Sequence, residues 1–119
     1  YNVEEGATIN INNNKCAMSA NMVRIGFKGA PNCTVNMNGN SYDATDANTD
    51  YAGLFLVQPY NAQTTSFAKT TINVNNTKKS TPDGQLYYLY AGPNDTQFTE
   101  ENMPTIYVDG VLDENPVIR

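Results

Sequence analysis

Apolar and polar side chains alternate with a period of two residues along much of this sequence, and this feature constrains the fold more than any other. In residues 7–12, alanine and isoleucine alternate with threonine and asparagine. Successive side chains of a β-strand point to opposite faces, so the pattern predicts a strand with one apolar and one polar face. The same alternation recurs at 23–28, 33–38, 71–75 and 106–108.

Two further segments are apolar on both faces. Residues 54–57 read Leu-Phe-Leu-Val, and residues 86–90 read Leu-Tyr-Tyr-Leu-Tyr. Such runs are typical of strands covered on both sides, or of strands that carry an exposed aromatic patch. In the second run, alternation places Tyr87 and Leu89 on one face and the other three side chains on the opposite face, so we expect at least one of these sets in the core.

Two dipeptides predict tight hairpins. Asn38-Gly39 and Asp109-Gly110 stand between β-type residues, and both central positions of a type I′ turn need the positive φ that these residues tolerate. We find no internal repeat of solenoid or propeller period. The sequence therefore predicts an all-β fold, an antiparallel β-sandwich of roughly seven to nine strands that is immunoglobulin-like or jelly-roll-like. At most one short helical turn is expected, at residues 99–103 before Pro104.

Chain length and charge restrict the class of protein. At 119 residues the chain suits a single domain, residues 1–119, which we expect to be a segment of a larger extracellular protein. The net charge of −5 comes with no basic stripe, so a nucleic-acid partner is not expected. No apolar run approaches the length that spans a bilayer, so membrane insertion is not expected either.

The two cysteines bear on the compartment. Cys16 and Cys33 have no histidine or second Cys pair near them, so they lack the four ligands of a zinc site. We predict a disulfide between them, which would stabilise the fold by about 3 kcal/mol and would indicate an oxidising, extracellular or cell-surface location. The alternative is a pair of thiols buried in the core of an intracellular protein.

Histidine is absent, and this argues against an enzyme. Without histidine the chain lacks the usual general base and the common nucleophile pairs. Carboxylate pairs are available, but no spacing predicts two of them across a cleft, and no tryptophan is present as a sugar platform. We therefore expect a non-catalytic protein.

One acidic segment is a candidate calcium site. Asp43, Asp46, Asn48 and Asp50 supply the oxygen ligands that calcium prefers, and the last three alternate as at the start of an EF-hand loop. Tyr51 stands where that loop requires glycine, so an EF-hand is excluded and only a looser loop site fits. The alternative interpretation is a solvated polar turn with no metal and no other cofactor.

Tyrosine is abundant, with eight residues in the chain. Tyrosine offers an amphipathic ring that stacks on sugars or packs in interfaces. Tyr42, Tyr51 and Tyr60, with Asn61, lie in or next to polar segments and are the candidate ligand-binding residues. The alternative is that the tyrosines are structural members of the core.

These observations predict a non-catalytic extracellular binding module. Its expected partner is carbohydrate or a glycosylated cell surface, recognised through tyrosine, asparagine and aspartate on loops or a sheet face. The alternative is a structural or assembly domain of a bacterial surface protein or of a virus or phage particle, which would contact protein neighbours.

Overall fold

The computed structural model describes residues 5–17, 23–25, 32–43, 55–57, 69–79, 86–89, 100–101 and 103–116. Within these ranges the protein is all-β, as the alternation predicts, and no described residue lies in a helix. Glu100 and Glu101, in the segment where a short helical turn is expected, lie in a turn, while Thr99 and Asn102 lie outside the described residues. The described ranges accordingly contain no helix that is long and apolar enough to cross a membrane.

Eleven strands form the described part of the chain, and each strand expected from the sequence coincides with one of them. They are β1 (Thr8–Asn12), β2 (Lys15–Ala17), β3 (Val23–Ile25), β4 (Thr34–Asn38), β5 (Ser41–Asp43), β6 (Phe55–Val57), β7 (Thr71–Asn75), β8 (Lys78–Lys79), β9 (Tyr88–Leu89), β10 (Thr105–Val108) and β11 (Val111–Leu112).

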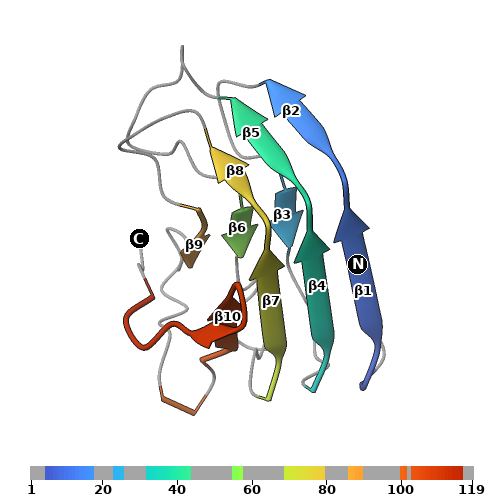
Figure 1. Cartoon of the computed structure of the whole chain (residues 1–119). Helices are drawn as coiled ribbons and strands as arrows, with labels where there is room; N and C mark the ends of the chain where they lie inside the picture. The colour runs from blue at the N-terminus through green and yellow to red at the C-terminus, as the bar shows by residue number, and fades with distance from the viewer. Residues whose placement is uncertain are drawn as a thin grey trace.

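The strands are wound into successive coils of a solenoid. β1, β4, β7 and β10 pair in parallel, in chain order, to form the first sheet. β2, β5 and β8 form a second parallel sheet, and β3, β6 and β9 a third. Each of the first three coils contributes one strand to each sheet, and the chain then returns to the first sheet one strand further along the axis (Figure 1).

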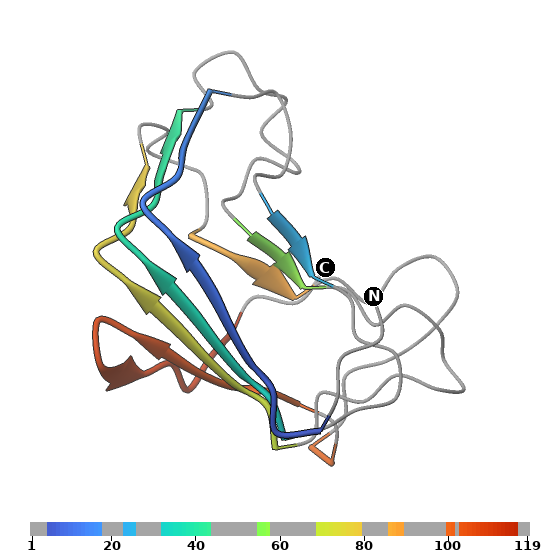
Figure 2. The same cartoon turned by 90° about the vertical axis from the view of Figure 1, so that its right-hand side faces the viewer.

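The coil is right-handed. In Figure 1 the strands of the first sheet point up at the front, those of the third sheet point down behind, and the coils advance to the left. Figure 2 shows that the first and third sheets face each other across the interior, while the second sheet continues from the first after a bend. Right-twisted strands favour this hand for parallel connections within a sheet.

The predicted antiparallel sandwich is therefore wrong for the described strands. Only β10 and β11 pair antiparallel there, around Asp109-Gly110, so this predicted hairpin is confirmed. Asn38-Gly39 is not a hairpin, because β4 and β5 belong to different sheets. Positive φ suits a corner between two sides of a coil as well as a hairpin turn, and the dipeptide alone does not distinguish them.

An internal repeat underlies the solenoid, contrary to the sequence-based expectation. The register aligns Thr8, Thr34, Thr71 and Thr105, each of which begins a strand of the first sheet. The four aligned segments read TININNN, TVNMNGN, TINVNNT and TIYVDGV. Their first residues are 26, 37 and 34 residues apart, so no constant period marks the repeat along the chain.

Residues in the left-handed backbone conformation bend the chain at both ends of these strands. Asn13, Gly39 and Asn76 share one register position at the corner after the strand, and all have positive φ. Gly6, Asn32 and Lys69 share the position two residues before the strand, again with positive φ. Glycine and asparagine tolerate this conformation better than other residues, which explains why asparagine is so frequent at the corners.

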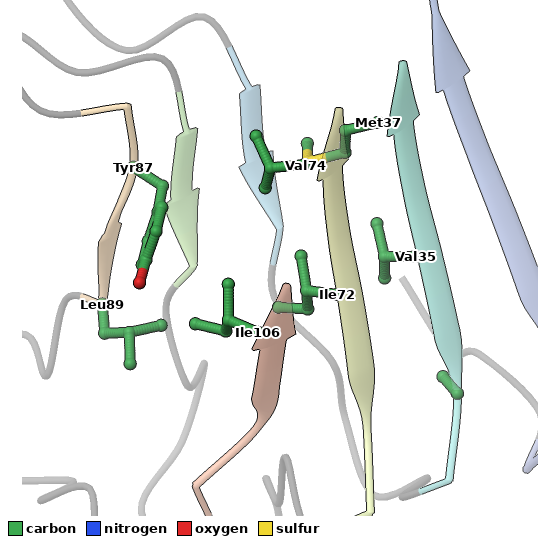
Figure 3. Packing of buried hydrophobic residues seen from close by; sticks show 8 residues of the cluster. Val35, Met37, Ile72, Val74, Tyr87, Leu89 and Ile106 are labelled. Carbon is green, nitrogen blue, oxygen red and sulfur yellow. The ribbon is translucent and has the colours of Figure 1, made fainter. Parts of the chain in front are cut away.

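The core lies between the first and third sheets (Figure 3). Inward side chains stack in register along the coils, and Tyr87 and Leu89 pack against them from the opposite side, which confirms the face expected to be buried. Among the residues whose burial is described, the buried apolar ones are Cys33, Val35, Met37, Ile72, Val74, Tyr87, Leu89 and Ile106. Burying such side chains contributes about 1.5 to 3 kcal/mol each, so this stack is the main stabilising element of the described fold.

The structure does not support the predicted disulfide. Cys33 is buried at the level of Ala7, whose carbonyl accepts the neighbouring Thr34 N–H. Cys16 lies in β2, beyond the full length of β1, which spans roughly 16 Å at the usual rise per residue. Bridged cysteines need Cα atoms within about 7 Å, and no disulfide is found among the described residues. The inference of an oxidising compartment therefore loses this support.

Candidate ligand-binding face

The outer side of the first sheet carries a regular array of polar side chains, which we call the amide face. Because side chains alternate along a strand, the residues opposite the core set all point outward here. They are Thr8, Asn10 and Asn12 on β1, Thr34, Asn36 and Asn38 on β4, Thr71, Asn73 and Asn75 on β7, and Thr105 and Tyr107 on β10.

Parallel, in-register pairing stacks identical residues on this face. The threonines form one row across all four coils, and two rows of asparagine run beside it over three coils. Neighbouring members of a row are about 4.8 Å apart, and neighbouring rows about 6.6 Å apart, as strand spacing and rise dictate. The face is therefore a two-dimensional lattice of hydroxyl and amide groups.

Side-chain hydrogen bonds hold the asparagine rows in place. In the first row, the Asn36 Nδ2 donates to Asn10 Oδ1 at 3.0 Å, and the Asn73 Nδ2 donates to Asn36 Oδ1 at 2.9 Å. The second row repeats this between the side chains of Asn38 and Asn12 at 3.1 Å and of Asn75 and Asn38 at 2.9 Å. Each row is thus an amide ladder in which every donor points toward the first coil.

The ladders leave hydrogen-bonding capacity toward solvent. An asparagine amide has two N–H donors and two acceptor lone pairs on its oxygen. Asn36 and Asn38 each use one donor and one lone pair within a ladder, so one of each is left for a ligand. Because the ladder fixes the plane of the amide, these spare groups are oriented before any ligand binds.

An aromatic residue ends the first asparagine row. Tyr107 occupies the β10 position of that row, beside Asn73, and is half-buried. Leu112 pairs with Tyr107 across the β10–β11 hairpin and is 47% exposed. Paired residues of an antiparallel ladder lie on the same side of the sheet, so the amide face meets a small apolar surface at this end.

A buried asparagine shapes the corner beside the face. Asn40 is fully buried, and its Oδ1 accepts hydrogen bonds from the Asn14 N–H at 3.0 Å and from Asn14 Nδ2 at 3.1 Å. Its Nδ2 donates to the Ile11 carbonyl at 2.8 Å. The side chain therefore ties the corner of the second coil to that of the first, and its bonds are structural.

The terminal hairpin is tied to the third coil by a tyrosine. The Tyr87 hydroxyl donates to Asp113 Oδ2, and the other carboxylate oxygen accepts the Asn115 N–H at 3.0 Å. Burial raises the pKa of Tyr87, and the hydrogen bond to Asp113 and the negative charge of that carboxylate raise it further. This tyrosine is a structural member of the core, as one interpretation of the tyrosines expected.

The predicted tyrosine site is untested by the structure. Tyr42 lies in β5, where its backbone is described, and Tyr51, Tyr60 and Asn61 lie outside the described residues. These four residues are therefore still predicted ligand contacts and no more.

The predicted calcium site is likewise untested. Asp43 ends β5, whereas Asp46, Asn48 and Asp50 lie outside the described residues. Within the described ranges, no group of three or more acidic, cysteine or histidine side chains could hold a metal ion.

The amide face was not singled out from the sequence. Alternation predicted which side of each strand is polar, but the strands were expected to pair antiparallel, and that would not have stacked equivalent asparagines. The pattern Thr-x-Asn-x-Asn at 8–12, 34–38 and 71–75 is the signal that identifies the rows. Comparison with known proteins adds no assignment, because no family model, curated protein or solved structure matches the chain.

Proposed function

We propose that this protein is a non-catalytic, extracellular module that binds neutral carbohydrate on the amide face. The observation that carries the proposal is the uncharged, in-register lattice of threonine hydroxyls and ladder-held asparagine amides on the first sheet. This surface replaces Tyr42, Tyr51 and Tyr60 as the favoured contact region.

The chemistry of the face suits sugar hydroxyls. A hydroxyl group donates one hydrogen bond and accepts others, and each central ladder amide offers one donor and one acceptor. None of the outward residues of β1, β4, β7 and β10 is charged, so the face offers no counter-charge to a phosphate or uronic acid. The spacing of about 4.8 Å between members of a row is on the scale of one sugar ring, so a polysaccharide that runs along a row would meet an equivalent amide at successive units.

Tyr107 supplies the apolar contact that such a ligand needs. A sugar ring has one face of C–H groups, which packs on an aromatic ring, while its hydroxyls reach the neighbouring amides. Tyr107 adjoins Asn73 in the register, so one ring on the tyrosine places its hydroxyls over the first asparagine row. We expect the ligand to run along this row, across the coils.

Binding to a panel of polysaccharides tests the proposal. We expect isothermal titration calorimetry to show binding of at least one of three soluble neutral polysaccharides: β-glucan, xyloglucan or mannan. The anionic polysaccharide polygalacturonate is expected not to bind. Tyr107→Ala should weaken the affinity about tenfold, which corresponds to about 1.4 kcal/mol, and Tyr107→Phe should preserve most of it. Asn115, which is exposed and is not one of the residues of the amide face, provides the control Asn115→Ala.

Two results would overturn the proposal. One is a folded protein that binds none of the neutral polysaccharides at millimolar concentration. The other is binding that survives both Tyr107→Ala and the double variant Asn36→Ala/Asn73→Ala, since the ligand would then lie elsewhere, for example at the tyrosines near residues 42–61.

The second candidate function is a structural module of a bacterial surface protein or of a virus or phage particle. The feature that favours it is the stacking of coils, because each coil of a solenoid completes the hydrogen bonds of its neighbour and further coils extend the rod. Under this alternative the asparagine ladders only stabilise the fold. Substitution of Asn36 would then lower the unfolding free energy, and the unmodified protein would bind none of the polysaccharides.

A further inference from the structure

The outer edge of β1 is the strongest candidate for a further interaction. Among the described strands, β1 pairs only with β4, and none of them pairs with its other side. Its inward residues Ile9 and Ile11 are only partly buried, whereas the equivalent Val35 and Met37 of the next coil are fully buried. The first coil therefore ends the core incompletely.

The hydrogen-bond pattern shows which groups this edge presents. Ala7 and Asn13 bond to β4 through their backbone, and the alternation of a parallel ladder assigns Ile9 and Ile11 to the same side. The backbone N–H and C=O groups of Thr8, Asn10 and Asn12 then point away from β4. We call these groups the β1 edge.

The amide ladders end at the same place. Asn10 and Asn12 accept hydrogen bonds from Asn36 and Asn38, but their own Nδ2 groups have no acceptor among the described residues. The equivalent Nδ2 groups of the next two coils all donate toward the first coil. Within the described ranges, the backbone groups of the β1 edge and the Nδ2 groups of Asn10 and Asn12 thus have no partners.

Sequence features that normally protect an edge strand are missing here. Natural edge strands carry lysine, proline or bulges that block pairing with another chain. Residues 7–12, Ala-Thr-Ile-Asn-Ile-Asn, contain none of these. At the other end of the first sheet, β11 is only two residues long and is flanked by Asp109, Asp113 and Glu114, so that end is protected.

We propose that two copies of this chain pair antiparallel through their β1 edges, with a two-fold axis at Asn10. This register pairs Asn10 with Asn10 of the second copy and Thr8 with its Asn12, so all six unpartnered backbone groups of each edge find partners. On the inner side it sets Ile9 opposite Ile11 of the second copy, which extends both cores. Closed two-fold pairing is the commonest symmetry of protein oligomers.

Charge complementarity supports the antiparallel arrangement. Glu5 and Lys15 are both exposed, and they lie five residues before and five residues after Asn10. In the antiparallel pair, Glu5 of one copy and Lys15 of the other therefore lie at the same end of the paired strands, just beyond the corners, twice by symmetry. A shift of one residue pair in either direction leaves a single isoleucine pair at the interface, Ile9 with Ile9 or Ile11 with Ile11, in place of two.

Sedimentation velocity over a dilution series from about 1 µM to 1 mM tests the dimer. The unmodified chain is expected to pass from monomer to dimer over this range. Asn10→Asp keeps the oxygen that accepts from Asn36 but sets two carboxylates opposite each other at the axis, so dimerisation should weaken at least tenfold. Asn12→Asp makes the same change in the other ladder. Because residue 12 faces the uncharged Thr8 of the second copy, this variant should weaken dimerisation much less than Asn10→Asp does.

Charge reversal and hydrogen exchange test the antiparallel dimer independently. Glu5→Lys should weaken the dimer several-fold, and Glu5→Lys/Lys15→Glu should restore it. In the unmodified chain, the amides of Thr8, Asn10 and Asn12 should become protected from exchange as concentration rises. A monomer at 1 mM, equal effects of Asn10→Asp and Asn12→Asp, or unchanged exchange of these three amides would overturn the proposal.

Discussion

The Tyr87 hydroxyl donates a hydrogen bond to the Asp113 carboxylate, and this contact joins the third coil to the hairpin that ends the first sheet. Tyr87 directly precedes β9, while Asp113 directly follows β11. The Asp113 N–H also donates to the Ile106 carbonyl at 2.9 Å, so the aspartate is fixed from both its backbone and its side chain. The terminal hairpin is therefore anchored across the interior, and not only through β10.

Removing the Tyr87 hydroxyl should destabilise the protein. Tyr87 is 7% exposed, and a hydrogen bond to a charged acceptor contributes about 2 kcal/mol. We expect Tyr87→Phe to lower the unfolding free energy by about that amount in urea denaturation. Tyr107→Phe is the matched control, because its half-buried ring lies on the outer face, and it should cost less than about 0.5 kcal/mol. Equal losses would mean that the Asp113 contact contributes nothing specific.

The same contact predicts a dependence on alkaline pH. The pKa of Tyr87 is raised in the folded state, while in the unfolded chain a tyrosine loses its proton near pH 10. Above that pH the unfolded state releases a proton that the folded state retains, so the contribution of Tyr87 is complete below pH 10 and is lost as pH rises further. The stability difference between the unmodified protein and Tyr87→Phe should therefore shrink above pH 10. A constant difference from pH 7 to 11.5 would contradict this.

The corner at Gly39 should be sensitive to a methyl group. Gly39 has a φ of 67°, and a Cβ there would lie 2.5 Å from Asn13 Oδ1 in the corner of the preceding coil. Gly110 has a φ of 79° with nothing within 4 Å of the same position. We expect Gly110→Ala to cost about 1 kcal/mol through backbone strain alone, and Gly39→Ala about 1 kcal/mol more through displacement of Asn13. Equal losses in thermal unfolding would show that Asn13 moves aside freely.

The faces of the strands were predictable from the sequence, while their pairing was not. Alternation correctly placed Val35 and Met37 inside, because the two-residue period depends only on the single strand. It carries no information on whether the neighbour runs parallel or antiparallel. The segments between aligned threonines differ in length, 26 residues after Thr8 but 37 after Thr34, and this variation hides the coil from a search for a fixed period.

The hairpin predicted at Asn38-Gly39 was wrong for a related reason. Asn38-Gly39 and Asp109-Gly110 look alike in sequence, and Gly39 and Gly110 both adopt positive φ. After Gly110 the chain returns along β10, while after Gly39 it continues onto the next side of the coil. The difference lies in the burial of Asn40, whose side chain bonds within the corner, compared with the exposed Val111 at the equivalent position. The local sequence predicts that the chain bends at these positions. The contacts of the residues after the bend decide whether the chain returns as a hairpin or continues onto the next side of the coil.

A buried hydroxyl offers a route to a more stable protein. Thr70 is fully buried, and its Oγ1 has no hydrogen-bond partner in the described part of the chain. A buried polar group without a partner costs about 1 to 3 kcal/mol, and valine has nearly the same shape without this cost. We expect Thr70→Val to raise the unfolding free energy by about 1 kcal/mol. The control is Thr71→Val, one residue later on the outer face, which should give no gain; a loss for Thr70→Val would show that the hydroxyl has a partner.

Asn40 and Asn38 carry the same side chain two residues apart, and their substitution should have very different effects. Asn40 is fully buried and makes three hydrogen bonds, to Asn14 twice and to the Ile11 carbonyl. Asn40→Ala leaves these groups without partners in the corner, and we expect a loss of about 3 kcal/mol or more. Asn38→Ala removes two ladder bonds at the surface, where water replaces them, and should cost about 1 kcal/mol. Urea denaturation of the two variants measures the difference. Similar losses would mean that the surface ladders stabilise the coils as much as the buried corner does.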